Sequence, residues 1–315
     1  MIELPERKTP RGGRLILPST RRFFEAARAA RQSWSSRLHG YIYARWLYLY
    51  IEIGIGEHPI ARLIGPLTRA LGSRTRPADP NRPTTADGYH GKVLPLEAAR
   101  QLIHVRESIS LGDLEHVIPY RLARELVLED PAHIVALECP CRSARATPCL
   151  PLDVCLVVGE PFASFTAEHH PGRARWITSD EAEGILEREH ARGHVQHAFF
   201  KDAMLGRFYA ICNCCPCCCG AMQAHRQGTP MLAASGYRAV FDPAGCSGCE
   251  VCRDACPFDA IRMQDAVPFT ESGKCMGCGV CVSACPTGSV SLVRDPQQGI
   301  PLELDRLMQA AAARG

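Results

Sequence analysis

Eighteen cysteines stand out in this chain of 315 residues, and eight of them fall into two identical runs. Each run reads C-x2-C-x2-C-x3-C-P, at residues 246–257 and again at residues 275–286. Three thiolates spaced in this way can wrap one face of a [4Fe–4S] cubane, and in two-cluster arrangements the fourth cysteine of each run ligates the other cluster. The spacing therefore predicts one centre held by Cys246, Cys249, Cys252 and Cys285, and a second held by Cys275, Cys278, Cys281 and Cys256.

Zinc ions or disulfide bonds explain these two runs less well than iron–sulfur clusters do. Zinc sites more often pair two C-x2-C units across a longer loop, and a structural zinc ion takes four ligands rather than two interleaved sets. Residues 237–294, which contain both runs, resemble a bacterial-type two-[4Fe–4S] ferredoxin. The resemblance implies a βαββαβ fold and one-electron transfer at low potential.

The other ten cysteines lie between residues 139 and 219, where three segments that read as strands end in cysteines. Six cysteines within eight residues exceed any packing demand and invite oxidation unless their thiolates bind metal. Iron–sulfur clusters are favoured over zinc, because thiolate-only sites suit both and the chain already has two cubane motifs. The first set of predicted ligands is Cys139, Cys141, Cys149 and Cys155. The second set is Cys212, Cys214, Cys215, Cys217, Cys218 and Cys219, and four or more of these six are expected to bind metal.

How these ten thiols divide between centres stays open from the sequence alone. The first set can complete one [4Fe–4S] centre, and four thiols of the second set can complete another. Mixed ligation between the two sets, or one larger cluster, agrees equally well with the spacing. We therefore expect one or two iron–sulfur clusters here, in addition to the two in the C-terminal segment.

The middle block also resembles, more weakly, a poorly characterised group of bacterial and archaeal multi-cluster iron–sulfur proteins. The likeness covers about residues 90–295 and rests on four elements in a fixed order. They are the CPCR element at Cys139–Arg142, the DVCL element at Asp153–Leu156, the run at Cys212–Cys219 and the C-terminal cysteine module. The resemblance implies cofactors and assigns no reaction.

Composition and patterning predict an α+β protein with a cysteine-rich α/β middle domain and a C-terminal two-cluster domain. Apolar residues make up 46 % and charged residues 22 % of the chain, as is ordinary for globular proteins. The predicted organisation is a basic, aromatic and amphipathic arm (1–75), a linker (76–90), a cysteine-rich metal-binding domain (91–236), a ferredoxin domain (237–295) and a helical tail (296–315).

Within the middle domain, apolar spacing and capping signals predict several elements. Helices are expected at 96–106, at 119–129 and from Thr178, as N-cap of a capping box with Glu181, to about Arg192. The last of these helices is expected to expose Glu181, Glu183, Glu187 and Glu189 to solvent. Strands are expected at 133–137, 153–158, 194–200 and 207–212, whereas His169 and His170 read as a loop.

The N-terminal arm is strongly basic. Residues 1–80 contain 14 Lys and Arg against 6 Asp and Glu, whereas the remainder of the chain is net acidic. The aromatic segment 41–55 is too short and too charged to span a bilayer, and an amphipathic helix is expected from Ile60 to Leu71. This pattern predicts either peripheral membrane contact through residues 14–71 or docking on the protein's own core or a partner subunit.

Other functional classes find less support in the sequence. The pair Arg21-Arg22 is similar to an export signal, but the segment after it is charged and polar. No HExxH motif, nucleotide-binding glycine fingerprint, nucleophile elbow or nucleic-acid recognition module is present, although a histidine could ligate a cluster. We therefore expect a cytoplasmic protein, with any membrane contact peripheral and on the inner face, and no nucleic-acid partner.

Two functions fit these observations. The first is an iron–sulfur electron-transfer protein, either a multi-cluster carrier or the electron-transfer subunit of an oxidoreductase complex, whose redox partner is an oxidoreductase or a flavoprotein. The alternative is a reductase with a catalytic cluster in residues 139–219 fed by the ferredoxin domain, because ten thiols are two more than two cubanes need. Arg142, beside two cluster thiols, either tunes a potential or pairs with a local carboxylate.

Overall fold

The structure is a computed structural model that describes residues 16–61, 85–112, 114–122, 124–271 and 273–312. Eight strands within these residues form one sheet in the middle of the molecule, in the order β2-β3-β4-β7-β6-β1-β8, with β5 beside β3. Neighbouring strands are antiparallel, except that β8 runs parallel to β1. The strands of this sheet are β1 (Tyr89–Leu94), β2 (Ile109–Leu111), β3 (Leu126–Glu138), β4 (Asp153–Glu160), β5 (Ala174–Ile177), β6 (Val195–Lys201), β7 (Arg207–Cys214) and β8 (Leu232–Ala233).

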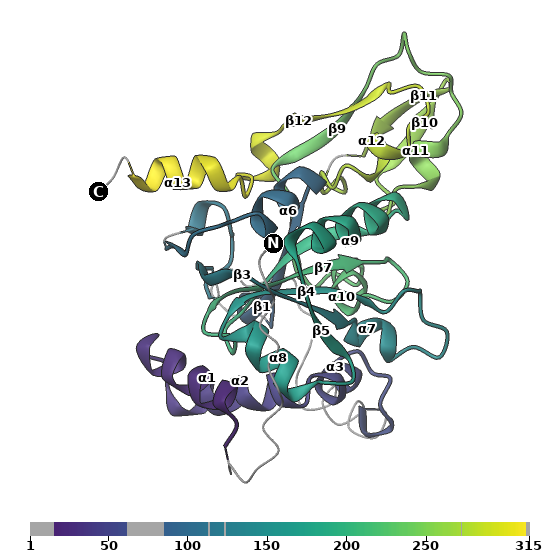
Figure 1. The fold of residues 1–315 in the computed structure, drawn as a ribbon. Helices are drawn as coiled ribbons and strands as arrows, with labels where there is room; N and C mark the ends of the chain where they lie inside the picture. The colour runs from purple at the N-terminus through teal and green to yellow at the C-terminus, as the bar shows by residue number, and fades with distance from the viewer. Residues whose placement is uncertain (1–15, 62–84, 113, 123, 272, 313–315) are drawn as a thin grey trace.

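Helices cover both faces of this sheet (Figure 1). On one face lie α6 (Leu96–Ile103) and α9 (Ser179–Ala191), which pack against each other and on the central strands. The other face carries α7 (Pro140–Ser143), α8 (Phe162–His169), α10 (Gly220–Arg226) and the N-terminal helices. The short helix α5 (Thr85–Gly88) precedes β1, and η1 (Leu114–His116) follows β2. The apolar side chains between the sheet and its helices form the main core.

The N-terminal arm folds onto this core through three helices, α1 (Pro18–Ala29), α2 (Trp34–Arg45) and α3 (Leu47–Gly54). Phe23 and Tyr43 are buried, and the Tyr43 hydroxyl lies 2.9 Å from that of Tyr209. At Gly40 a Cβ atom would lie 2.1 Å from the Ala203 carbonyl oxygen, so only glycine permits this close approach of α2 to the sheet. One side of the arm therefore docks on the protein's own core.

The C-terminal domain lies against the end of α9, on the side of the sheet opposite to the arm (Figure 1). Its elements follow the order strand, helix, strand, strand, helix, strand. They are β9 (Tyr237–Phe241), α11 (Val251–Asp254), β10 (Ile261–Gln264), β11 (Val267–Thr270), α12 (Val280–Ala284) and β12 (Val290–Arg294). After η2 (Pro296–Gln298), helix α13 (Leu304–Ala312) returns the chain to the middle domain, near α6 and β2.

Most of the expected elements are present, but two expectations are wrong. Residues 126–138 form strand β3 where a helix was expected to run to residue 129, because Leu126 and Leu128 alternate into the core while β3 pairs with β2. His169 is the last residue of α8 rather than part of a loop. The expected linker overlaps the sheet, since β1 begins at Tyr89.

Some expectations lie outside the described residues, including most of the helix expected from Ile60 to Leu71 and the segment 76–84. Among the residues that the structure describes, no helix combines the length and the hydropathy needed to cross a bilayer.

Candidate metal centres

The C-terminal domain gathers its eight cysteines around two separate cavities. One cavity is lined by the thiols of Cys246, Cys249, Cys252 and Cys285. The other is lined by the thiols of Cys256, Cys275, Cys278 and Cys281. In both cases the three closely spaced cysteines of one run meet the last cysteine of the other run, because α11 and α12 pack side by side.

Local backbone geometry makes this wrapping possible. The residue before each short helix, Glu250 before α11 and Gly279 before α12, has a positive φ angle, which turns the chain sharply around the thiols. Backbone N–H groups of Gly248 and Ala260 donate to the sulfur atoms of Cys246 and Cys256 at 3.5 and 3.3 Å. Such N–H···S bonds stabilise thiolates, and they help to set the reduction potential of a cluster held there.

Four cysteines of the middle domain form a compact set, which we call the four-thiol site: Cys149, Cys215, Cys217 and Cys218. All four sulfur atoms lie within 4.8 Å of one another, and those of Cys149 and Cys217 are 3.0 Å apart. The Cys149–Cys217 contact raises the pKa of Cys149 to about 11. Partial burial acts to raise the pKa of Cys217 as well, but thiol hydrogen bonds from Cys149, Cys215 and Cys218 outweigh it and lower that pKa.

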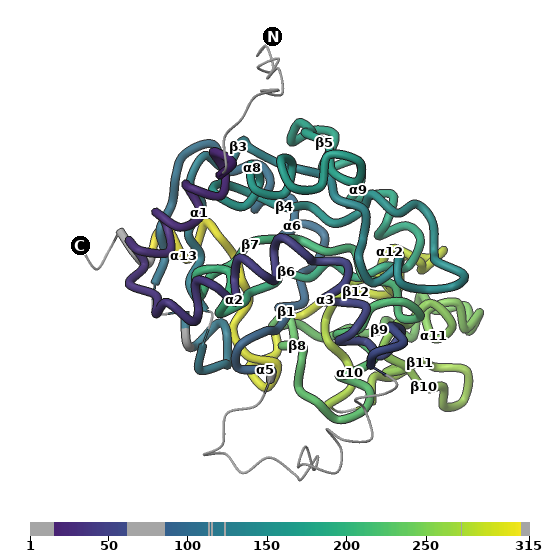
Figure 2. The backbone as a smooth tube through the Cα atoms, turned by 90° about the horizontal axis from the view of Figure 1, so that it is seen from below, coloured from purple at the N-terminus to yellow at the C-terminus, as the bar shows by residue number. Residues whose placement is uncertain are grey.

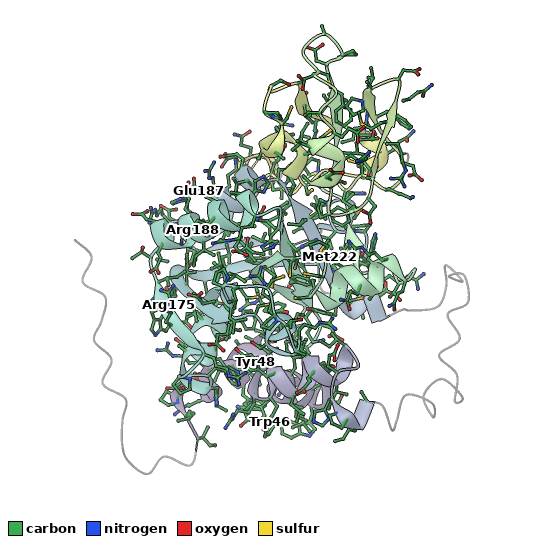
Figure 3. The ribbon with its side chains drawn as sticks, turned by 90° about the vertical axis from the view of Figure 1, so that its right-hand side faces the viewer. Trp46, Tyr48, Arg175, Glu187, Arg188 and Met222 are labelled. Atoms are coloured by element: carbon green, nitrogen blue, oxygen red, sulfur yellow. The ribbon has the colours of Figure 1, made fainter. Side chains whose placement is uncertain are left out.

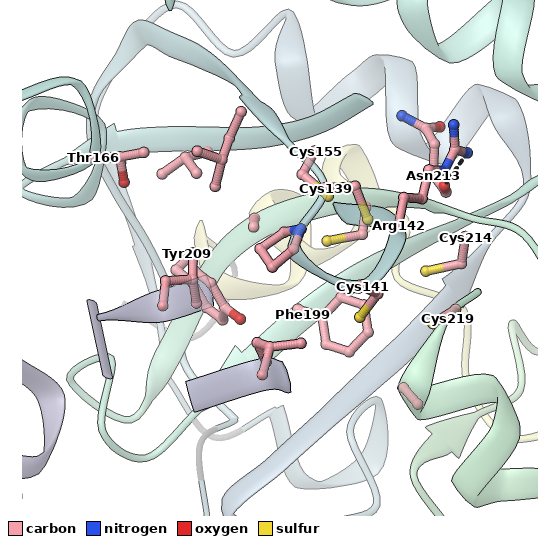
Figure 4. Close-up of a pocket in the computed structure, with 18 of the residues that line it drawn as sticks. Cys139, Cys141, Arg142, Cys155, Thr166, Phe199, Tyr209, Asn213, Cys214 and Cys219 are labelled. Atoms are coloured by element: carbon pink, nitrogen blue, oxygen red, sulfur yellow. Dashed lines mark hydrogen bonds between the residues drawn. The ribbon is translucent and has the colours of Figure 1, made fainter. Parts of the chain in front are cut away.

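The other six cysteines surround a cavity between the sheet and the helices α2, α3, α7 and α10 (Figure 4). We call this set the six-thiol site: Cys139, Cys141, Cys155, Cys212, Cys214 and Cys219. Strand pairing brings Cys155 of β4 opposite Cys212 of β7, and thiol contacts link Cys139 with both Cys141 and Cys155. The hydrogen bond with Cys141, together with burial, raises the pKa of Cys139 to about 12, so metal that binds here must displace protons.

The structure thus divides the ten middle-domain thiols differently from the two sets expected from the sequence. Cys149 lies with cysteines of the 212–219 run, whereas Cys212, Cys214 and Cys219 join Cys139, Cys141 and Cys155. The physical reason is that β4 and β7 are neighbours, so the loops at their ends interleave. Mixed ligation, which the spacing left open, is the arrangement that the geometry favours.

Arg142 lies between the two middle-domain thiol sites and is almost entirely buried, with 1 % of its side chain exposed. Its guanidinium donates to Glu189 Oε2 at 2.6 Å and to the carbonyl oxygens of Pro151 and Asn213 at 2.6 and 3.1 Å. Burial disfavours the charged guanidinium, but the hydrogen bond with Glu189, together with the negative charges of Glu189, Cys215 and Cys139, outweighs burial and raises the pKa of Arg142. Arg142 therefore pairs with a carboxylate and places positive charge beside Cys215 and Cys139.

Glu189 is buried, so the expectation that it belongs to a solvated face of α9 is wrong. Its side chain is 1 % exposed, and its carboxylate also accepts from His194 Nδ1 at 2.7 Å. Burial acts to raise the pKa of Glu189, but its bonds with His194 and Arg142 outweigh burial and lower it. The sequence offered a signal that was not used, because a fixed arginine beside metal-binding thiols requires a counter-charge.

A groove of about 760 Å³ separates the C-terminal domain from α9 and the four-thiol site. Cys217 of the four-thiol site and Cys256 of the C-terminal domain both line it. Arg226, at the end of α10, donates to the carbonyl oxygens of Pro216 and Pro257 at 3.1 and 2.8 Å, and so holds the two cysteine loops together. No sequence pattern singled out Arg226.

A second polar connection joins the domains within this groove. Ser283, in the cysteine helix α12, contacts His190 of α9 at 2.9 Å, and the other ring nitrogen of His190 contacts Gln196. Gln196 in turn donates to the side chain of Asn213, which lies between Cys212 and Cys214 in β7. The two domains are thus joined by partly buried hydrogen bonds as well as by apolar contact.

The residues present fit iron–sulfur clusters by their donor chemistry. Each of the four sets supplies at least four thiol sulfurs from converging loops, and thiolates are the ligands that such clusters prefer. In addition, Arg142 lines the six-thiol cavity, and its Nε atom has no hydrogen-bond partner among the described residues, so it is free to donate to a bound cluster.

Comparison with known proteins assigns the C-terminal part of the chain. Residues 238–286 match the family model of the 4Fe-4S dicluster domain. No curated protein matches the chain. The match and the grouped cysteines show that the protein binds multiple 4Fe–4S clusters, and they indicate iron–sulfur electron transfer. Residues 238–286 are accordingly a 4Fe–4S domain of the ferredoxin type.

Proposed function

We propose that this protein is a multi-centre electron-transfer protein, in which the ferredoxin-type domain exchanges electrons with a redox partner and two further centres lie in residues 139–219. A bound [4Fe–4S] cluster takes up and releases one electron at a time. The partner proposed from this chemistry is an oxidoreductase or a flavoprotein. In this proposal the four-thiol site and the six-thiol site each hold one iron–sulfur cluster.

The observation that carries the proposal is the shared groove. Cys256 and Cys217 line the same cavity, and Arg226 bonds to the residue after Cys256 and to the residue before Cys217. The four-thiol site in turn adjoins Arg142, which lines the six-thiol cavity. The sets of thiols therefore follow one another through the molecule, as electron transfer between its two ends requires.

Metal and sulfide counts, combined with electron paramagnetic resonance of anaerobically purified protein, test this proposal. We expect about sixteen iron atoms per chain, four for each [4Fe–4S] cluster. Cys217→Ser is expected to remove the signal of one centre while the signals of the dicluster domain persist, and the matched variant Cys249→Ser is expected to do the reverse. A count near eight iron atoms, or zinc at the four-thiol site, would contradict the proposal.

The second candidate function is a reductase whose catalytic cluster is held at the six-thiol site. One feature of the geometry of this site favours it. Seven cysteines line this cavity, the six of the six-thiol site and Cys215, whereas a cubane needs four. Tyr43 and Tyr209, whose hydroxyl groups lie 2.9 Å apart, line the same cavity. An iron site with a free position would then face proton donors. A resonance signal from this centre that changes on addition of a reducible small molecule would favour the reductase over the carrier.

A further inference from the structure

The outer face of the N-terminal helices exposes a continuous apolar row. Three side chains of α2 and that of Trp46, which joins α2 to α3, follow one another at a spacing of four residues. Two more side chains continue the row along α3. We call this set the apolar stripe: Trp34, Leu38, Ile42, Trp46, Leu49 and Ile53. Trp34 is 67 % exposed and Trp46 is 48 % exposed, which is unusual for the largest apolar side chain.

This exposure does not arise from loose helices, because their inner face is firmly packed. Gly40, Tyr43 and Ala44 are buried between the stripe and the sheet. The Tyr48 hydroxyl donates to the Glu138 carbonyl oxygen at 2.8 Å, and His170 contacts the Ala44 carbonyl oxygen at 2.8 Å. The stripe is therefore presented on a fixed scaffold, along the side of the molecule that Figure 2 views.

Basic side chains border the stripe. Arg22, Arg28 and Arg31 are exposed on α1 and just after it, and α1 packs beside α2, with Phe24 stacked on Trp34. Arg45 lies over the ring of Trp46, 5.7 Å from its centroid. Residues 16–61 contain six arginines and three glutamates, and one of those glutamates, Glu57, is paired with Arg145.

We propose that the apolar stripe and its arginine border dock this protein on the surface of an anionic phospholipid bilayer. Tryptophan and aliphatic side chains enter the boundary between headgroups and acyl chains, where the indole ring is favoured, while arginines bind lipid phosphates. The charge favours an anionic lipid surface over an apolar protein partner, because arginines outnumber glutamates six to three in residues 16–61. Figure 3 shows Trp46 at the end of the molecule remote from the dicluster domain, so docking leaves that domain facing water.

Vesicle flotation tests the proposal with the full-length, cluster-loaded protein. We expect wild-type protein to float with vesicles of phosphatidylcholine and phosphatidylglycerol, to float less with phosphatidylcholine alone, and to be released at high salt. Trp34→Ser combined with Trp46→Ser is expected to lower the partition coefficient at least about tenfold. Trp176→Ser is the matched control, since Trp176 is 39 % exposed on β5 and lies outside the stripe.

Iron content and absorbance in the visible range verify that each variant retains its fold and clusters. Flotation of the double variant at the wild-type level would overturn the proposal, as would the absence of wild-type flotation. If the wild-type protein instead forms a dimer that the double variant cannot form, the stripe is an interface between two copies, and membrane docking is likewise overturned.

Discussion

Among single residues, Arg142 and Glu189 have the most demanding environment in the molecule. Both charges are buried and pair with each other, and Glu189 also contacts His194 and Arg192. A buried ion pair contributes little by itself, whereas loss of one partner leaves an uncompensated charge in the interior. The pair also lies beside thiols of both middle-domain sites, so its loss affects metal ligands as well as packing.

Glu189→Gln is expected to lower the free energy of unfolding by about 3–5 kcal/mol, because the Arg142 guanidinium then lacks a counter-charge. Anaerobic urea denaturation followed by circular dichroism measures this loss. Glu181→Gln is the control, since it breaks an exposed pair with Arg175 and is expected to cost less than about 1 kcal/mol. Equal losses in the two variants would show that Glu189 has no special role.

Lys92 gives the stability a pH dependence that can be assigned to one group. Its amino group donates to the Ile300 carbonyl oxygen at 2.9 Å, and burial lowers the pKa of Lys92 to about 7. In the unfolded chain a lysine holds its proton to a pH of about 10.4, so between pH 7 and 10 the unfolded state binds more protons and stability rises with pH.

Lys92→Met is expected to remove the part of the increase in stability between pH 7 and 10 that comes from Lys92. The measurement is the free energy of unfolding of wild type and variant at pH 7, 8 and 9, where the difference between the two curves isolates Lys92 from other titrating groups. Two parallel curves would mean that Lys92 keeps its charge in the folded protein.

At the scale of elements, α2 is held at the closest backbone approach in the arm. Gly40→Ala is expected to cost about 1–3 kcal/mol, because the new methyl group would overlap the Ala203 carbonyl oxygen and the Phe23 ring. Hydrogen exchange of α2 amides should accelerate. Gly54→Ala in α3 is the control, since a Cβ atom at Gly54 would meet nothing within 4 Å and alanine favours a helix. Equal destabilisation of the two variants would argue against a special role for the close approach at Gly40.

Local signals explain which elements the sequence could predict. Thr178 accepts from the Glu181 N–H and starts α9, as the capping pattern indicated, and β4, β6 and β7 follow short apolar runs. The segment around Leu126 was predicted wrongly because its strand state depends on pairing with β2, which is a tertiary contact. Over a segment this short, neither helical spacing nor strand alternation of apolar residues is a strong signal of secondary structure.

The candidate sites show the same division between local and tertiary information. Cysteines three residues apart in the dicluster runs reveal their own grouping, because a local turn brings them together. Cys149 and Cys217 are 68 residues apart and meet only through the order of strands in the sheet. Arg226 and Glu189 could not be found by motif, since each acts through contacts to residues far away in the chain.

For the whole molecule, Arg226 is one of the residues that join the two domains, because it bonds to Pro257 of the C-terminal domain while it holds the Pro216 loop of its own domain. Arg226→Met is expected to release the loop of Pro216 from that of Pro257, to increase hydrogen exchange on both sides of the groove and to leave iron content unchanged. Arg253→Met is the control, since that arginine forms exposed pairs with Glu250 and Asp254, in and beside its own helix α11. Unchanged exchange at the groove would show that the junction does not depend on Arg226.

The helices that present the apolar stripe also form a wall of the six-thiol cavity, because Tyr43, Ala44, Leu47 and Ile51 line it from their inner side. Binding events on the two sides of α2 and α3 therefore share one structural element. If binding to the bilayer changes the equilibrium constant for reduction of a centre at these thiols, then reduction of that centre must change the affinity for the bilayer by the same factor. A protein built in this way would attach to and leave its lipid surface according to its oxidation state.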